Sequence, residues 1–339
     1  MSSLLNLKKD NYRLLLAQRK NNYKRQMILN KIALSKNIII GNKKETNSDN
    51  IINNKNNENN ENNKIKHNIF LTIKTKVPFK PEFKILKNPF SLDSNVKIYL
   101  YTICYNEEFI IPHFLKHYYY VDKIFVYDNC SNDNTIKLLK MDSRCEIIKF
   151  SSNFDDRVNQ YIKNNCWKQH RNVCDYAIVC DIDEFLWINN NTSIKDLLQS
   201  YKNKKKSIDY LPTIGYNMVH KNVIDNNILL VDQIKYGIRD NMYSKLNIFN
   251  VNSVKNMNFG PGSHLCNIET FSTKVIMGPK ILLLHYKFIG GKKRLRNRYV
   301  EFGKRLSQNN KNRNEGMHYL KNPDIEYDSL YARSTKILI

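Results

Sequence analysis

Two carboxylates follow one short apolar segment in the middle of the chain. Asp181 and Asp183 come directly after Tyr176–Cys180 (YAIVC), which is long enough for a buried strand. Carboxylates at positions i and i+2 past a strand can face one hard divalent cation, and such a cation can hold a diphosphate. Phe185–Trp187 comes next and is expected to anchor an exposed loop that carries both carboxylates. The alternative is that Asp181 caps the next turn and Asp183 is solvated.

Two further polar clusters follow apolar segments nearer the N-terminus. Cys104–Glu108 (CYNEE) comes after one of these segments, and Asp128–Asp133 (DNCSND) ends another. In an open parallel sheet, polar side chains at such positions lie where ligands bind. Each cluster also has a local interpretation, because Asn106 can cap a helix and Asp128 can end its strand in an Asx-turn.

Alternating strands and helices are expected to position these clusters. The expected strands are Val96–Ile103, Lys123–Asp128, Arg144–Phe150 and Tyr176–Cys180, and the expected helices are Glu107–Tyr120, Asn132–Met141 and Arg157–Asn172. Strand–helix alternation with short connections favours parallel strands joined by right-handed crossovers, as in a Rossmann-like sheet. Because ligands bind such a sheet at the carboxyl ends of its strands, the three polar clusters are expected to meet there.

The second half of the chain has a more mixed pattern. The expected strands are Tyr210–Met218, Ile228–Val231, Val275–Met277 and Ile281–Tyr286. A basic helix is expected at Lys292–Leu306, and its lysines and arginines are expected to form mainly a solvated face. His285 lies at the end of an apolar run, and His264 ends a GPGSH segment. A histidine after apolar residues is more often a packed core residue than a ligand, so both roles stay open for His285.

Glycine-rich phosphate loops are absent from the sequence. Neither GxGxxG nor GxxxxGK[ST] occurs, and the whole chain has 10 glycines. These absences exclude a dinucleotide fingerprint and a P-loop. Any bound phosphate must therefore be neutralised by side chains or by a metal ion.

The chain is strongly basic. Its 339 residues include 55 Lys and Arg against 31 Asp and Glu, which gives a net charge of +24. Such a charge attracts polyanions, but the accompanying load of Asn, Ile and Tyr is also typical of AT-rich codon usage. Seven irregularly spaced cysteines favour free thiols. No signal peptide or membrane-spanning stretch is recognisable, so a cytoplasmic protein, or one packaged in a particle, is expected.

Composition divides the chain into four parts. Residues 1–41 are expected to form a basic amphipathic helical arm, and residues 42–94 an Asn-rich, low-complexity linker and connector. Residues 95–310 hold the α/β pattern, and residues 311–339 are a C-terminal tail. The arm either contacts a polyanion or membrane surface, or is a solvated extension.

Five segments together resemble glycosyltransferases of the family 2-like and family 92-like (DUF23-type) group. They are Ile103–Phe109 (ICYNEEF), Phe125–Thr135 (FVYDNCSNDNT), Ala177–Trp187 (AIVCDIDEFLW), Gly260–His264 (GPGSH) and Leu283–Tyr286 (LLHY). The resemblance implies a GT-A fold, which is a Rossmann-like, mostly parallel sheet with flanking helices. It covers residues 95 to about 305 and leaves the N-terminal arm out.

The resemblance also implies an activity and a set of site residues. Such an enzyme moves a sugar from a nucleotide-sugar donor, with a UDP-sugar favoured, to a hydroxyl of a glycan, protein or lipid acceptor, with inversion. A bound Mn²⁺ or Mg²⁺ neutralises the leaving diphosphate. The implied nucleoside contacts are Tyr105, Asn106, Glu107, Asp128 and Asn129; the implied metal ligands are Asp181 and Asp183 with His285 or His264; Lys245, Lys287 and Arg294 are basic residues that can assist.

The general base is the least specified part of the implied mechanism. Family 2 enzymes use an Asp in a later Glu-Asp pair, which this chain lacks. Glu184, next to the two aspartates, and the more remote Asp240 are the candidates. Two other functions stay open: a polyanion-binding or nucleic-acid-binding protein that uses the basic arm, and a catalytically silent nucleotide-sugar binder. No nucleic-acid module is recognisable, and the sequence indicates no oligomeric state.

Overall fold

The computed structural model describes residues 70–72, 95–188, 192–337 and 339. The predicted helical arm at 1–41 and nearly all of the predicted linker at 42–94 lie outside these residues. The described residues belong to one compact unit, which includes most of the predicted tail at 311–339. None of the helices described in this unit is long and apolar enough to cross a membrane.

The larger sheet has seven strands, and its five neighbouring parallel strands carry the predicted Rossmann-like pattern. Its order is β1 (Phe70–Thr72), β4 (Cys145–Ser151), β3 (Lys123–Asp128), β2 (Ile98–Cys104), β5 (Tyr176–Val179), β10 (Ile248–Asn250) and β7 (Tyr210–Leu211). The last two strands are antiparallel to their neighbours. All four strands predicted in the first half are therefore present, within two residues of their predicted ends.

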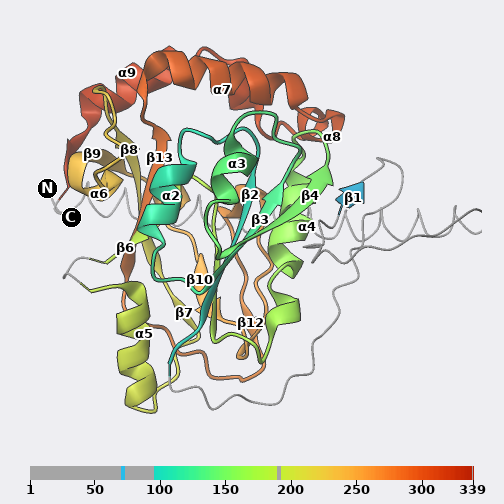
Figure 1. Cartoon of the computed structure of the whole chain (residues 1–339), viewed down its shortest axis with the longest axis vertical. Coiled ribbons are helices and arrows are strands. Elements are labelled where there is room, and N and C mark those ends of the chain that lie inside the picture. Colours follow the sequence, from blue (N-terminus) through green and yellow to red (C-terminus); the bar gives the residue numbers. More distant parts are fainter. Residues whose placement is uncertain (1–69, 73–94, 189–191, 338) are drawn as a thin grey trace, which may run out of the picture. The chain divides into compact units, whose positions relative to one another are not determined.

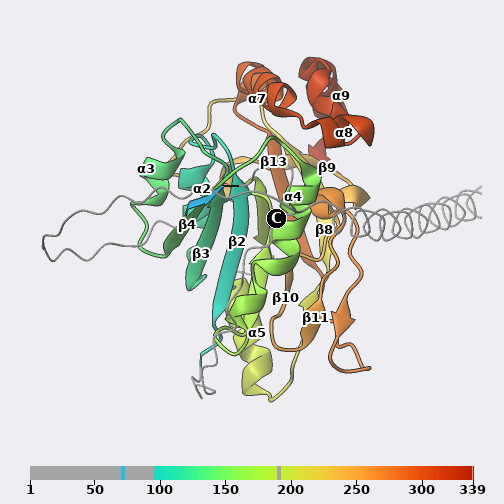
Figure 2. The ribbon, with the colours of Figure 1, turned by 90° about the vertical axis from the view of Figure 1, so that its right-hand side faces the viewer.

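Helices cover both faces of this sheet because side chains alternate along its central strand. In β2, Ile98 and Leu100 face one apolar core, and Tyr99 and Tyr101 face another. Figure 2 shows α3 and α4 on opposite sides of the strands. The helices of this half are α2 (Ile111–His117), α3 (Thr135–Leu139), α4 (Asp156–Asn165) and the 3-10 turn η1 (Lys168–His170).

A second sheet of five strands holds the late histidine. Its order is β14 (Thr335–Lys336), β9 (Tyr236–Arg239), β8 (Thr213–Val219), β13 (Ile281–Phe288) and β6 (Glu184–Trp187). Strand β13 runs parallel to β8 and antiparallel to β6, so His285 lies opposite Asn217 on one side and Glu184 on the other. The segment expected to anchor an exposed loop, Phe185–Trp187, is thus part of a strand.

Three predictions for the second half are wrong. Pro212 divides the predicted strand Tyr210–Met218 into β7 and β8, which belong to different sheets. The predicted strand Ile228–Val231 overlaps the short helix α6 (Leu230–Gln233), because an apolar run of four residues does not distinguish strand from helix. Val275–Met277 lies on the surface and forms only an isolated bridge with Tyr210.

The C-terminal helices close one end of the unit. Figure 1 shows α7 (Gly291–Arg305) and α9 (Pro323–Arg333) at the same end of the unit, and Figure 2 shows them side by side. Ion pairs join Lys292 to Asp328 and Arg296 to Asp324 across them. The other elements are α5 (Ile194–Asn203), α8 (Gln308–Asn312), β11 (Val254–Asn256), β12 (Glu269–Thr270), η2 (Asn241–Tyr243), η3 (Pro261–Ser263) and η4 (Met317–Leu320).

Candidate functional site

A cavity of about 340 Å³ lies where the carboxyl ends of β2 and β5 meet the second sheet. Asp181 and Asp183 line it together with His264 and His285. The four side chains expected to bind a metal therefore border one space. The wall also includes residues from α4, α7 and η4, so elements from the whole length of the described unit contribute to it.

Asp183 and His285 form a buried pair at the cavity wall. The Asp183 Oδ1 atom lies 3.7 Å from His285 Nε2, and Arg298 Nη2 donates to Asp183 Oδ2 at 3.2 Å. The Asp183 side chain is 5% exposed, so the expectation of an exposed loop is wrong for this residue. Burial alone would raise the pKa of Asp183, but His285 and Arg298 outweigh burial and hold that pKa well below its usual range.

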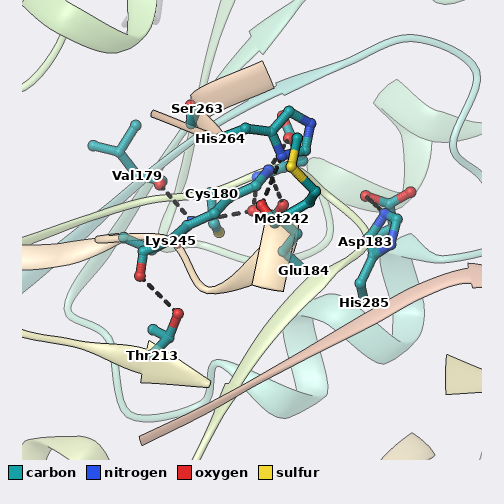
Figure 3. A network of polar contacts seen from close by, with 12 residues as sticks. Val179, Cys180, Asp183, Glu184, Thr213, Met242, Lys245, Ser263, His264 and His285 are labelled. Atoms are coloured by element: carbon teal, nitrogen blue, oxygen red, sulfur yellow. Dashed lines mark hydrogen bonds and ion pairs between the residues drawn. The ribbon is translucent and has the colours of Figure 1, made fainter. Parts of the chain in front are cut away.

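The His285 ring is held in place by groups that the sequence did not indicate. Its Nδ1 atom lies 2.7 Å from Asn217 Oδ1, and Asn217 Nδ2 donates to Asp240 Oδ2 at 2.9 Å. A carboxylate only accepts hydrogen bonds, so this chain makes the Asn217 oxygen the acceptor and places the ring proton on Nδ1. Tyr243 stacks on the ring at 4.1 Å between centroids. The Nε2 atom of His285 is therefore free to face Asp183, and Figure 3 shows the two side chains next to each other.

The Asp183–His285 pair could supply two ligands of a divalent cation whose other ligands come from a bound molecule. A carboxylate oxygen and an imidazole nitrogen facing each other at 3.7 Å can both reach one ion, and a fixed Nδ1–H is the usual support for a ligating histidine. Within the described residues, no group of three or more His, Cys, Asp or Glu could hold a metal alone. An ion held by this pair would take its remaining ligands from a bound substrate or from water.

Asp181 lies in a different environment from Asp183, because two lysines neutralise it. Lys163 Nζ donates to Asp181 Oδ1 at 2.6 Å, and Lys245 Nζ lies 3.4 Å from Oδ2. Burial alone would raise the pKa of Asp181, but the two ammonium groups lower it. Lys245 also pairs with the buried Glu184, and Figure 3 shows these two residues in the same polar network. Lys245 therefore forms ion pairs with two carboxylates of its own chain.

Neither predicted base lines the cavity. Glu184 is 1% exposed, and its two carboxylate oxygens accept from Lys245, from Asn247 Nδ2 at 3.0 Å and from the backbone of Asp181 at 3.1 Å. Asp240 accepts from Asn217 and caps the turn η2 that carries Tyr243. The geometry therefore gives Glu184 a structural role and Asp240 a role in positioning His285.

His264 lies on the Asp181 side of the cavity. Its Nδ1 atom is 2.8 Å from the carbonyl oxygen of Met242, and Figure 3 shows it apart from the Asp183–His285 pair. Burial, followed by the charge of Lys245, lowers the pKa of His264 to about 4. The ring is therefore neutral at physiological pH.

The predicted nucleoside contacts separate into two groups. Tyr105, Glu107 and Asn129 line the cavity. Asp128 is fully buried and accepts from the backbone of Ser131, which is the Asx-type alternative. Asn106 has a left-handed φ of 51°, and its side chain donates one hydrogen bond to Asn132 and accepts another from it. Both side chains thus shape the two loops at this edge of the sheet.

Helix α7 contributes cations to the cavity, contrary to the expectation of a mainly solvated face. Arg298 pairs with Glu107 and Asp183, and Arg305 lies over the Tyr105 ring at 3.3 Å while donating to the carbonyl oxygens of Asn129 and Ser152. The two arginines are seven residues apart and share one helix face. That spacing was the signal that sequence reasoning missed.

The family model for glycosyltransferase family 92 matches residues 107–328. The chain belongs to glycosyltransferase family 92. The matched residues include Glu107, the two aspartates, His285 and all of α7, so every wall of the cavity contains family residues. Membership shows sugar transfer as the general activity, with a donor and an acceptor as substrates. A comparison with curated proteins gives no match.

Proposed function

We propose that this family 92 protein transfers a sugar from a nucleotide-sugar donor, with a UDP-sugar favoured, to a hydroxyl of a glycan, protein or lipid acceptor. The proposal rests on the buried Asp183–His285 pair, which lies at a cavity on the carboxyl edge of a parallel sheet. We also propose that the fold is of the GT-A type, which the five parallel strands and the position of the cavity support.

Asp183 and His285 are the side chains that would hold Mn²⁺ or Mg²⁺. When bound together with the donor, such an ion supplies Lewis-acid neutralisation of the diphosphate. Asn217 keeps the His285 Nε2 atom available, and Arg298 supplies a positive charge next to Asp183. The two protein ligands leave most of the coordination shell to the donor, so metal and donor are expected to bind together.

Tyr105 and Asn129 line the part of the cavity proposed for the nucleoside. The Tyr105 ring is held by Arg305 on one face and contacts Phe302 edge-on at 6.2 Å. An aromatic ring fixed in this way is a platform on which a base can stack. We propose a single displacement with inversion, in which a base near the acceptor takes the proton of its hydroxyl.

Hydrolysis of nucleotide sugars tests this proposal directly. Release of the nucleoside diphosphate from UDP-glucose, UDP-galactose and UDP-N-acetylglucosamine is measured with Mn²⁺, with Mg²⁺ and with excess chelator. We expect slow hydrolysis with one donor, which chelator abolishes and added Mn²⁺ restores. Asp183→Asn is the matched inactive control. Turnover that is equal with and without chelator would remove the metal from the proposal and leave the transferase assignment intact.

A further inference from the structure

Two cations that line the cavity have no carboxylate within ion-pair distance in the described residues: Arg305, which donates instead to two backbone carbonyl groups, and Lys287. Lys163, Lys245 and Arg298 each pair with a carboxylate, as described above. Lys287 also lines the cavity and is 6% exposed, but no carboxylate of the described chain lies within ion-pair distance of it. A buried ammonium without such a partner is costly, because it has lost its hydration.

Three aromatic rings surround the Lys287 ammonium, which makes no hydrogen bond or ion pair with the described part of the chain. Its Nζ atom lies 5.0 Å from the ring centroid of Phe288, 4.8 Å from that of Tyr299 and 5.5 Å from that of Tyr319. Ring faces attract a cation but replace only part of its lost hydration. The surroundings of Lys287 thus suit an ammonium that completes its shell with an anion from outside the chain.

The strand places Lys287 next to the proposed metal ligands. His285 and Lys287 are two residues apart in β13, and both side chains line the cavity, although the pairing of β13 with β8 is irregular between His285 and Phe288. Arg298 borders the same space from α7. A diphosphate that contacts an ion at His285 therefore extends within reach of the Lys287 ammonium.

We propose that Lys287 binds a phosphate of the donor's diphosphate and neutralises the charge that this group gains when the sugar leaves. The inference rests on the proposed function. In that step the bond between the anomeric carbon and the terminal phosphate oxygen breaks, and its electron pair stays on the oxygen. The acceptor oxygen forms the new bond to carbon, and its proton passes to a base or to water. The phosphate gains one negative charge, which a fixed ammonium stabilises.

Calorimetry with Lys287→Met tests this assignment. Methionine keeps an unbranched apolar side chain among the three rings and removes the charge. Wild-type protein is first titrated with UDP, GDP, CDP and ADP in Mn²⁺ to find the nucleotide that binds. The variant is then titrated with that diphosphate, its monophosphate and its nucleoside. We expect at least a tenfold loss of affinity for the diphosphate and less than a twofold change for the nucleoside.

Two further variants separate a specific contact from a general charge effect. Lys304→Met removes the same charge from an exposed position of α7 and is expected to leave all three affinities unchanged. Lys287→Arg keeps the charge and is expected to restore most of the diphosphate affinity. Metal-free Lys287→Met is also expected to melt at a higher temperature than wild type, because an unpaired buried charge is gone.

The outcomes distinguish the inference from the proposed function. If wild-type protein binds a nucleoside diphosphate and Lys287→Met binds it equally well, Lys287 is not a phosphate ligand, although the proposed function stands. An equal loss for the diphosphate and the nucleoside, with a lower melting temperature, would give Lys287 a structural role and overturn the inference. If wild-type protein binds none of the four diphosphates, the inference and the proposed donor class both fail.

Discussion

Asp181 and Asp183 are two residues apart, yet their carboxylates differ in the kind of cation beside them. Asp181 contacts two lysine ammonium groups, and one of these also pairs with the buried Glu184. Asp183 contacts an imidazole nitrogen and a guanidinium that it shares with Glu107. The first carboxylate is therefore neutralised within the protein, whereas the second shares its environment with a ring nitrogen that can bind a metal. Equal spacing from a strand does not make two carboxylates equal ligands.

The largest expected effect is that of Asp183→Asn, which removes the negative charge from the proposed metal site at Asp183 and His285. We expect turnover in Mn²⁺ to fall by about 10³-fold or more, because a proposed ligand is lost and the leaving group is no longer neutralised. Because Asp183 is buried beside Arg298, the melting temperature should also fall. Product release and thermal melts measure the two effects. Near-normal turnover in Mn²⁺ would assign the metal elsewhere.

Two variants on the Asp183 side of the cavity, His285→Ala and Asn217→Ala, are expected to weaken Mn²⁺ binding to different degrees. We expect His285→Ala to weaken Mn²⁺ binding by about 100-fold and Asn217→Ala by about 10-fold, since a residue that only orients a ligand contributes less than the ligand itself. Titration of Mn²⁺ in the presence of the bound nucleotide provides the measurement. If His285 is only a core residue, both variants lower the melting temperature with and without metal, and Mn²⁺ affinity does not change.

Asp181→Asn should affect catalysis less than Asp183→Asn. Asparagine keeps the size of the side chain but leaves Lys163 without its carboxylate, whereas Lys245 retains Glu184. We expect turnover to fall by about 10-fold through misplaced charge, with Mn²⁺ affinity changed by less than about threefold. A loss of Mn²⁺ affinity as large as that in Asp183→Asn would show that both carboxylates ligate the ion. The difference that we draw between Asp181 and Asp183 would then be wrong.

A variant of Asp156, whose pKa is raised by burial and, to a smaller extent, by the charge of Asp181, tests the Asp181 side of the cavity through the free energy of unfolding. Burial, followed by the charge of Glu315, raises the pKa of Asp156 to about 6, although Lys163 and a hydrogen bond from Asn310 act in the opposite direction. A raised pKa means that the folded chain is stabilised below about pH 4 and loses this contribution as the pH rises through 6. Asp156→Asn should therefore stabilise the fold by about 2–3 kcal/mol at pH 8 and very little at pH 4. Urea unfolding at both pH values measures the difference, and an equal gain at both would contradict the shifted pKa.

Local sequence was sufficient for the parallel strands and for the clustering of polar residues at their ends. Val96–Ile103 and Lys123–Asp128 are rich in β-branched and aromatic residues and are followed by polar residues. Such a pattern indicates a buried strand. The five motifs also identified the family, because their order adds information that no single motif contains. His285 was recognisable as a candidate for the same reason: it ends an apolar strand on the side where the acidic residues gather.

The partners of the site residues could not be predicted, because they are distant in the sequence. Glu184 looked like a base from its position beside Asp183, but its hydrogen bonds to Lys245 and Asn247 span more than 60 residues. The link from Asp240 through Asn217 to His285 likewise depends on how β8 and β13 pair. Strand register and sheet assignment determine these contacts, and neither is encoded in local composition.

The contribution of η4 to the cavity has a consequence for how the protein is made. Tyr319 and His318 line the same space as Tyr105, more than 200 residues earlier in the chain. During translation the strands of the parallel sheet leave the ribosome well before η4 does, at about 5–20 residues per second. The nascent chain can therefore begin to bury its central sheet while one wall of the sugar-transfer site has not yet been synthesised. A sugar donor in the surrounding solution cannot occupy the completed site until the helices that follow β13 have emerged and packed.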